Sequence, residues 1–112
     1  MNLKSSLVVG SVLVASVAPT VIAQTVDASA AEALAKKSGC FNCHAVDRKK
    51  DGPSFKETAA KLKGKPDAEK ELYTHLTTRP KIKVDGNEEE HASLKTKNDA
   101  DINNVIRWIL SR

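Results

Sequence analysis

The sequence has few of the features that a large enzyme or a membrane-spanning protein needs. Its 112 residues include two Phe, one Tyr, one Trp, two Cys and a single methionine, Met1. A chain of this length forms one domain at most. No apolar stretch approaches the ~20 residues of a helix that crosses a bilayer. These shortages argue against a large enzyme with its own substrate domain and against a transmembrane protein.

Residues 1–23 have the pattern of a secretory signal peptide. Lys4 precedes an apolar stretch, Leu7–Ala18, and the segment ends in Val21-Ile22-Ala23. A positive start, a short apolar stretch and small residues before the cut are typical of such signals. The alternative is an uncleaved anchor, but the stretch covers about 12 residues against ~20 for a spanning helix. We therefore expect cleavage, export to a bacterial periplasm, and a mature domain of residues 24–112 that does not insert into the membrane.

The mature domain has a thin apolar core. Residues 24–112 contain eighteen apolar side chains larger than alanine, apart from the two cysteines. A domain of this size buries only ~60% of its unfolded surface and usually needs a staple, metal or cofactor when its core is thin. A charged fraction of 29%, together with clear apolar periodicity, argues against disorder. The sequence therefore predicts a fold built around a group that the chain does not supply.

Basic side chains are concentrated in the half of the mature chain that contains the cysteines. Residues 24–65 carry nine basic and five acidic side chains, whereas residues 66–112 carry eight and nine. A basic surface can bind nucleic acid, but export and the scarcity of aromatic residues argue against that partner. We expect instead a face that docks a protein partner. An ordinary solvated face is the alternative.

Apolar periodicity and capping residues predict four short helices. Strand signals are poor, since only Lys81–Val84 alternates, and Asp85-Gly86 closes it as a turn. Residues 78–98 form a long polar connection, of the kind that is usually functional or wrapped around something. The expected helices are residues 27–37, capped by Asp27 or Ser29; 54–63, with a Ser54/Glu57 capping box; 66–77, with Pro66 in the first turn; and 99–111, starting at Asp99 or Asp101. The sequence thus predicts an all-α fold of about four short helices around one bound object.

Cys40-Phe41-Asn42-Cys43-His44 identifies that object. The pattern C-x-x-C-H is the attachment signature of c-type haem. Two thiols at this spacing add to the two vinyl groups of one porphyrin, and the histidine that follows presents its imidazole to the iron. We therefore predict one haem c, bound covalently through Cys40 and Cys43, with His44 as an iron ligand.

Three other interpretations of the cysteine pair are weaker. A disulfide across two intervening residues would close a strained ring that staples almost nothing. A thioredoxin-like dithiol sits at the start of a helix after a strand, in a βαβ setting that this sequence lacks. A zinc site needs four ligands, and the only further candidates are His75 and His91.

The segment GCFNCHAVDRKKDGPSFKETAAKLKG, followed by a helix and then by INNVIRWIL, resembles the short bacterial class I cytochromes c. The resemblance covers nearly all of residues 27–112. It implies that the Pro53 carbonyl accepts a hydrogen bond from His44 and so fixes the orientation and basicity of that ligand. It also implies that the first and last helices pack together, through Leu34 and the last helix's isoleucines, with Trp108 in the core.

The sequence departs from this family at the sixth iron ligand, which is a methionine in the loop before the last helix. The only methionine here, Met1, leaves with the leader. His91 lies close to the position of that methionine and is the expected replacement. Because thioether ligation raises the reduction potential, a second imidazole should lower it. The neighbouring residues Glu88–Glu90 are expected to favour the protonated form of His91 when it is detached.

Other arrangements of the sixth position stay open. One alternative is that His91 is a solvated loop residue. His75, Asn87 and Lys95 are further candidate ligands, and the last alternative is an empty sixth position on the iron. His75 lies inside the third helix, where the family often carries a basic residue near a haem propionate. The resemblance therefore implies a cofactor-binding role for His75.

These features predict a monomeric, periplasmic carrier of single electrons rather than an enzyme. An exposed haem edge would be surrounded by basic residues that steer an acidic redox partner: Lys36, Lys37, Arg48, Lys49 and Lys50. The alternative is a sensor or gas-binding haem protein in which His91 leaves the iron. A small peroxidase is a third reading, but nothing beside the haem suggests the distal catalytic pair that it would need.

Overall fold

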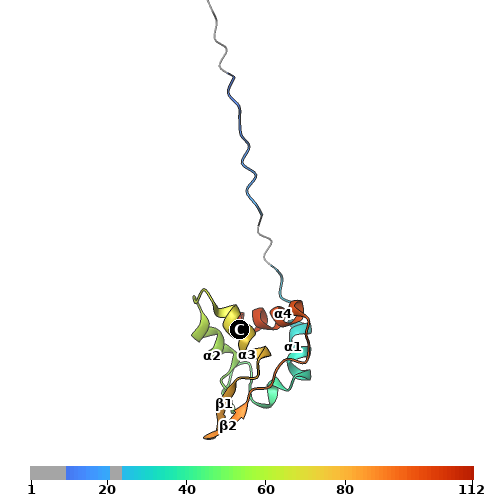
Figure 1. Ribbon diagram of the computed structural model, residues 1–112, viewed down its shortest axis with the longest axis vertical. Helices are drawn as coiled ribbons and strands as arrows, with labels where there is room; N and C mark the ends of the chain where they lie inside the picture. The colour runs from blue at the N-terminus through green and yellow to red at the C-terminus, as the bar shows by residue number, and fades with distance from the viewer. Residues whose placement is uncertain (1–9, 21–23) are drawn as a thin grey trace, which may run out of the picture.

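The computed structural model describes residues 10–20 and 24–112. In the second range, four α-helices, one 3₁₀ turn and a two-stranded hairpin follow one another along the chain. The helices pack around one core, and the hairpin projects from them (Figure 1). The predicted fold of four short helices is confirmed, with the hairpin as an addition.

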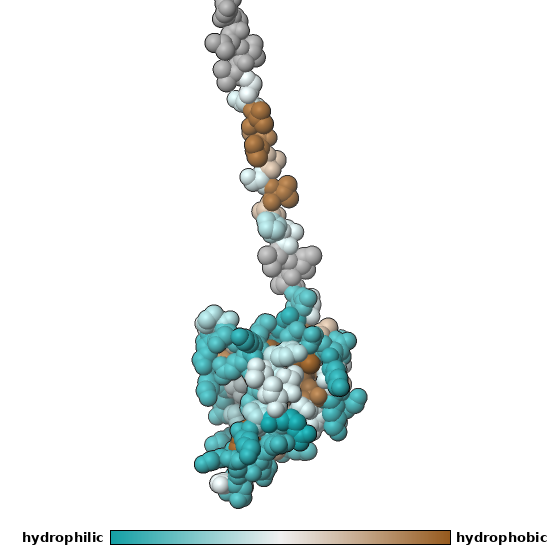
Figure 2. Space-filling view, in the orientation of Figure 1, coloured by the Kyte–Doolittle hydropathy of each residue, from teal (hydrophilic) through white to brown (hydrophobic). Residues whose placement is uncertain are grey.

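Residues 10–20 form no helix or strand and bury none of their large apolar side chains. Val12, Leu13, Val14 and Val17 are between 82% and 96% exposed, and they form the brown stretch of Figure 2. The rest of the expected leader, including its cleavage site, lies outside the described residues. Within the described ranges, every helix is too short or too polar to cross a bilayer.

Helices α1 (Ala28–Lys37) and α4 (Asp99–Leu110) pack against each other. Ala31 and Ala35 are fully buried, and side chains this small let the two helices approach closely. The Asp27 carboxylate caps α1 by accepting from the Ala30 N–H at 2.9 Å. Asn104 of α4 bonds both backbone groups of Asp27, at 2.9 and 2.8 Å. The first and last helices are thus paired, as the family resemblance implies.

Helix α4 supplies the largest share of the core. The predicted stripe of Ile102, Val105, Ile106 and Ile109 is buried, and Trp108 is 2% exposed. The predicted start of this helix at Asp99 is confirmed, and Asn98 caps it by accepting from the Ala100 and Asp101 N–H groups. Asp99 and Asp101 lie in the first turn, where their negative charge stabilises the helix dipole.

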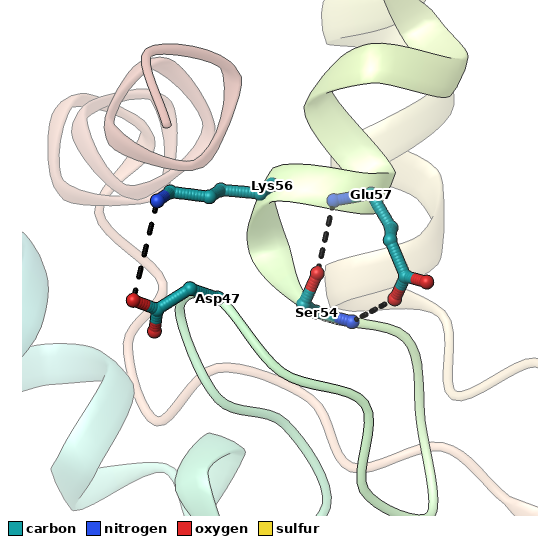
Figure 3. Close-up of polar contacts among 4 residues, drawn as sticks. All are labelled: Asp47, Ser54, Lys56 and Glu57. Carbon is teal, nitrogen blue, oxygen red and sulfur yellow. Dashed lines mark hydrogen bonds and ion pairs between the residues drawn. The ribbon is translucent and has the colours of Figure 1, made fainter.

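Helix α2 (Phe55–Leu62) begins at the predicted capping box. The Ser54 hydroxyl accepts from the Glu57 N–H at 3.0 Å, and the Glu57 carboxylate accepts from the Ser54 N–H at 2.7 Å (Figure 3). Lys56 reaches back to Asp47 at 4.0 Å, on the segment that precedes the helix. The cap therefore fixes where the polar segment ends and where Phe55, the first buried residue of α2, enters the core.

Helix α3 (Ala68–Thr77) starts two residues later than predicted. Residues 65–68 form a turn, closed by the Ala68 N–H and the Lys65 carbonyl at 3.3 Å, so Pro66 precedes the helix instead of lying in its first turn. One face of α3 is buried through Ala68, Leu72 and Leu76.

The connection between α3 and α4 contains an antiparallel hairpin of β1 (Lys81–Val84) and β2 (Asn87–Glu90). Asp85 and Gly86 form its two-residue turn, with φ of +49° and +80°, as a type I′ turn requires. The expected long polar connection is therefore partly wrong. All four residues of β2 are exposed and its sequence is Asn-Glu-Glu-Glu. The strand therefore lacks the alternation of apolar and polar residues by which strands are predicted.

Candidate haem site

The Cys-x-x-Cys-His motif lies where α1 gives way to a 3₁₀ turn, Cys40–Asn42. Gly39 makes the change of direction in the left-handed region, at φ +79°. The His44 N–H donates to the Cys40 carbonyl at 2.9 Å, which closes the motif into a single turn. Both cysteines are half-buried free thiols, and burial raises the pKa of Cys40. Two thiols and one imidazole are thus presented from five consecutive residues.

The ring of His44 is held by contacts on several sides. Its Nδ1 lies 2.6 Å from the Pro53 carbonyl oxygen, the contact that the resemblance implies. The ring of Phe55 stacks on it with centres 5.4 Å apart and planes 22° apart. A Cβ at Gly52 would lie 2.5 Å from His44 Cε1, so only glycine fits there. Gly52 therefore supports the position of the His44 ring. Sequence analysis did not assign Gly52 to the site, although the Gly52-Pro53 pair was the signal that could have identified it.

Three of the four aromatic residues pack next to His44. Phe55 meets Trp108 edge to face with ring centres 5.3 Å apart, and Phe41 meets Phe55 at 5.9 Å. Edge-to-face pairs of this kind each add about 0.5–1.5 kcal/mol beyond the area that they bury. The aromatic cluster of Phe41, Phe55 and Trp108, through which Phe55 stacks on His44, is therefore continuous with the core that α4 supplies.

The fold brings His91 opposite His44 from 47 residues further along the chain. The two ring centres are 6.1 Å apart, with planes 54° apart. His91 follows β2 directly, and its N–H donates to the Pro80 carbonyl at 2.8 Å. Its Nδ1 is buried and has no hydrogen-bond partner within the described part of the chain. A buried imidazole nitrogen without a partner is suited to binding a group that the protein chain does not itself contain.

His75 lies next to His91. Their ring centres are 4.2 Å apart, because the last two turns of α3 run alongside the segment that follows the hairpin; the Leu94 N–H donates to the Leu76 carbonyl at 3.0 Å. The structure thus places His75 against the candidate ligand His91. Its contact with a haem propionate stays a prediction.

The expectation that Glu88–Glu90 favour protonated His91 is wrong. Burial lowers the pKa of His91, and the nearby rings of His75 and His44 lower it further. Burial also lowers the pKa of His75, followed by the effect of His44. The glutamates are exposed and partly neutralised: Glu88 pairs with Lys81 at 2.7 Å, and Glu90 with Arg79 at 3.1 Å.

The donor set fits an iron porphyrin better than a zinc ion. A first-row metal bonds an imidazole nitrogen at about 2 Å, so two imidazoles on opposite sides of one ion have ring centres roughly 6 Å apart. His44 and His91 have that separation. In residues 10–20 and 24–112, no three His, Cys, Asp or Glu side chains converge on one point that would hold a metal ion. The two thiols therefore fit a covalent attachment, and the two imidazoles fit axial ligation.

Basic side chains from two distant segments meet near the motif. Lys36 and Lys37 end α1 and are exposed. The Lys95 N–H donates to the Ser38 hydroxyl at 2.9 Å, which brings Lys95 to the same end of α1. Lys37 and Lys95 line one open hollow of about 320 Å³. Lys95 is a member of the basic face that sequence analysis did not reveal, because Ser38 and Lys95 are 57 positions apart in the chain.

Of the basic residues predicted around the haem edge, Lys50 is tied to the motif itself. Its Nζ donates to the Phe41 carbonyl at 2.6 Å. Arg48 and Lys49 are exposed on the same loop. Lys50 therefore packs over the 3₁₀ turn, whereas the charged groups of Arg48 and Lys49 face solvent.

Comparisons with known proteins identify similar structures and relatives. The class 1 cytochrome MtoD of Sideroxydans lithotrophicus ES-1 has a similar structure, with a TM-score of 0.74 and 48% identity, covering 78% of this chain and 97% of that one. The cytochrome c552 of Nitrosomonas europaea has a TM-score of 0.56 and 31% identity, covering 71% and 96%.

Among curated relatives, cytochrome c-551 of Pseudomonas aeruginosa is 47% identical over 45 residues, which are 40% of this chain and 43% of the relative. The chain thus spans less than half the length of the curated relatives that it matches. The family model for cytochrome c, in contrast, matches residues 28–112. Since that match runs from the start of α1 to the last residue, this chain belongs to the cytochrome c family, and its cofactor is one haem c attached through Cys40 and Cys43.

Proposed function

We propose that the protein is an exported electron carrier, not an enzyme, that passes single electrons between redox proteins. The observation that carries the proposal is the pair His44 and His91, whose ring centres lie 6.1 Å apart in a chain whose only methionine is Met1. Haem c supplies the reversible ferric–ferrous couple. If His44 and His91 both bind the iron, the haem would have no open position in either oxidation state, and electron transfer would need little rearrangement of the protein.

The chain holds its two proposed ligands in ways that suit this role. The Pro53 carbonyl accepts from His44 Nδ1 at 2.6 Å, which fixes the ring and raises its basicity. Phe55 stacks on that ring and is itself packed against Trp108 of the core. A second imidazole in place of the family's thioether implies a lower reduction potential.

The basic face supports an acidic redox partner. Lys36, Lys37 and Lys95 are exposed close to the cysteines, and Arg48 and Lys49 add charge from the next loop. Such a surface steers encounters and makes the association rate fall with added salt. Electron exchange with an acidic protein, measured by stopped flow at rising ionic strength, should slow in the wild type and depend less on salt in Lys37→Gln/Lys95→Gln.

Export through a cleaved leader, with the haem attached covalently, completes the proposal. Residues 10–20 expose four large apolar side chains that the folded domain does not cover, as expected of a segment that a signal peptidase removes. Covalent attachment then keeps the haem with the exported chain. Mass spectrometry of the protein matured in a periplasm tests both points: a mass of residues 24–112 plus one haem supports them, and a full-length chain contradicts them.

The ligands are tested by visible absorption of the haem-loaded protein. A low-spin spectrum in both oxidation states, without the methionine-to-iron charge-transfer band, is expected of the wild type. His91→Ala should turn it high-spin and allow the ferrous form to bind carbon monoxide, whereas His75→Ala should stay low-spin. A wild type that is already high-spin, or His91→Ala that stays low-spin, would overturn the assignment of His91. An open iron in the wild type would favour the gas-binding alternative.

A further inference from the structure

The β1–β2 hairpin has no part in the core and contains no proposed ligand, yet it ends one residue before His91. We propose that the hairpin is the positioning element for His91: it sets which residue of the α3–α4 connection faces His44, and how firmly. This inference rests on the proposed function, because it takes His91 as the sixth iron ligand.

The backbone on both sides of His91 is fixed. The hairpin pairs Lys81 with Glu90, and the His91 N–H continues the pairing by one bond to the Pro80 carbonyl at 2.8 Å. Three residues later, the Leu94 N–H donates to the Leu76 carbonyl at 3.0 Å, and Leu94 is buried. His91 thus lies between one anchor on the hairpin and one on α3.

The register of the hairpin decides which residue occupies that place. Neighbouring residues of a strand point to opposite sides, so a slip of one residue would turn the His91 ring away from His44. The Asp85-Gly86 turn sets the register, because both residues have the positive φ of a two-residue loop. The ion pairs Lys81–Glu88 and Arg79–Glu90 join the strands in the same register.

No distant residue of the described chain hydrogen-bonds the ring itself, although burial, which lowers the pKa of His91, is opposed by the backbone of the neighbouring Ala92, which raises it. His91 Nδ1 has no hydrogen-bond partner within the described residues, in contrast to His44, and the aromatic neighbours of the ring are His75 at 4.2 Å and His44 at 6.1 Å. The position of the ring therefore depends on the backbone that carries it. Loosening the hairpin should release His91 from the iron without disturbing haem attachment.

Two glycines provide a matched test. Gly86 in the hairpin turn and Gly64 after α2 have φ of +80° and +79°, and a Cβ at either position would meet no atom within 4 Å. Alanine at either site therefore introduces the same backbone strain without a clash of its Cβ, and valine adds the larger strain of a β-branched residue at both sites. Of the two glycines, Gly86 belongs to the hairpin. The variants are Gly86→Ala, Gly86→Val, Gly64→Ala and Gly64→Val, all as haem-loaded protein.

The readouts are the high-spin fraction of the ferric spectrum and the fraction of ferrous protein that binds carbon monoxide at a fixed concentration. Gly86→Val should raise both by about tenfold over the wild type, given the cost of left-handed backbone for a β-branched residue. For both readouts, Gly86→Ala should lie between the wild type and Gly86→Val. The Gly64 variants should lose comparable thermal stability and leave both readouts unchanged. Far-UV circular dichroism checks that the helices remain.

The outcomes separate this inference from the function on which it rests. If His91→Ala turns the protein high-spin while Gly86→Val behaves like Gly64→Val, the hairpin has no positioning role and the carrier proposal stands. If His91→Ala leaves the protein low-spin, the ligand assignment fails first, and the hairpin inference fails with it. A graded rise confined to the Gly86 series supports the inference.

Discussion

His44 and His91 lie 6.1 Å apart, but the chain supports them differently. Apart from the His91 ring, the contacts described for the His44 ring come from its own segment: the Pro53 carbonyl and the ring of Phe55, with Gly52 close beside the ring. His91 depends instead on a hairpin register and on the end of α3. The first proposed ligand is fixed through its side chain and the second through its backbone. Ligand release should therefore respond to changes on the His91 side, whereas changes on the His44 side should mainly reduce stability.

The largest loss of stability is expected from Phe55→Ala. Phe55 is 5% exposed, stacks on His44 and touches Trp108, so truncation should lower the free energy of unfolding by about 3–5 kcal/mol. Guanidinium unfolding of the haem-loaded protein measures the loss. Phe55→Leu, which keeps most of the volume, is the control and should cost clearly less. If carbon monoxide binding of the ferrous protein rises as much as in His91→Ala, the contrast between the two sides is wrong.

Leu94→Ala tests the His91 side with a buried apolar residue. Leu94 is 6% exposed and anchors the chain just after His91, so its truncation should cost about 2–5 kcal/mol. In contrast to Phe55→Ala, it should also increase carbon monoxide binding, because the second anchor of His91 is weakened. Leu62→Ala, 4% exposed in α2, is the matched control. Equal carbon monoxide binding in the two variants would remove the distinction.

Gly52→Ala sharpens the contrast from the His44 side. The added methyl would lie 2.5 Å from His44 Cε1 and 2.9 Å from its Nδ1, so the ring must move. We expect a loss of about 1–3 kcal/mol in unfolding free energy, as for other overpacked sites. The absorption spectrum should shift as the contact between His44 and Pro53 lengthens. Gly64→Ala, where a Cβ meets no atom within 4 Å but φ is +79°, is the control and should lose stability without shifting the spectrum. An unperturbed Gly52→Ala would contradict the close approach.

The smallest expected effect is on the pH dependence of stability, through the Ser54/Glu57 capping box at the start of α2. Hydrogen bonds from the Ser54 backbone and hydroxyl lower the pKa of Glu57 below its ordinary value of 4.5. A carboxylate with a lowered pKa stabilises the folded state above that ordinary value, and the stabilisation is lost as pH falls through the folded-state pKa. Thermal unfolding between about pH 6 and pH 3 should therefore show a shallower decline in Glu57→Gln than in the wild type. Parallel curves for the two proteins would show that the cap does not contribute to acid sensitivity.

The elements that sequence analysis located are those whose signals are local. The Ser54/Glu57 box and the apolar stripe of α4 each operate within one or two turns of helix, and the structure contains both. The Cys-x-x-Cys-His motif likewise places its thiols and imidazole within a single turn. For these segments the residues that determine the conformation are neighbours in the chain.

What sequence analysis missed depends on contacts between distant segments. The strand β2 reads Asn-Glu-Glu-Glu and has no apolar alternation, because both of its faces are exposed. The contact of His75 with His91 joins residues 16 positions apart through the path of the hairpin. The effect of Glu88–Glu90 on His91 was misjudged because proximity in sequence was taken for proximity in space. Their side chains pair with Arg79 and Lys81 instead.

The hairpin's polar second strand also affects how molecules meet one another. In the described part of the chain the sheet has only two strands, so each strand has one backbone edge without a β partner. Such edges can pair with the same edge of another copy. Here three of the four residues of β2 are glutamates. Glu88 and Glu90 are paired with Lys81 and Arg79, so two such edges would bring strongly polar, ion-paired side chains and the charge of Glu89 together. The residues that made β2 hard to recognise as a strand thus disfavour edge-to-edge pairing between copies of this protein.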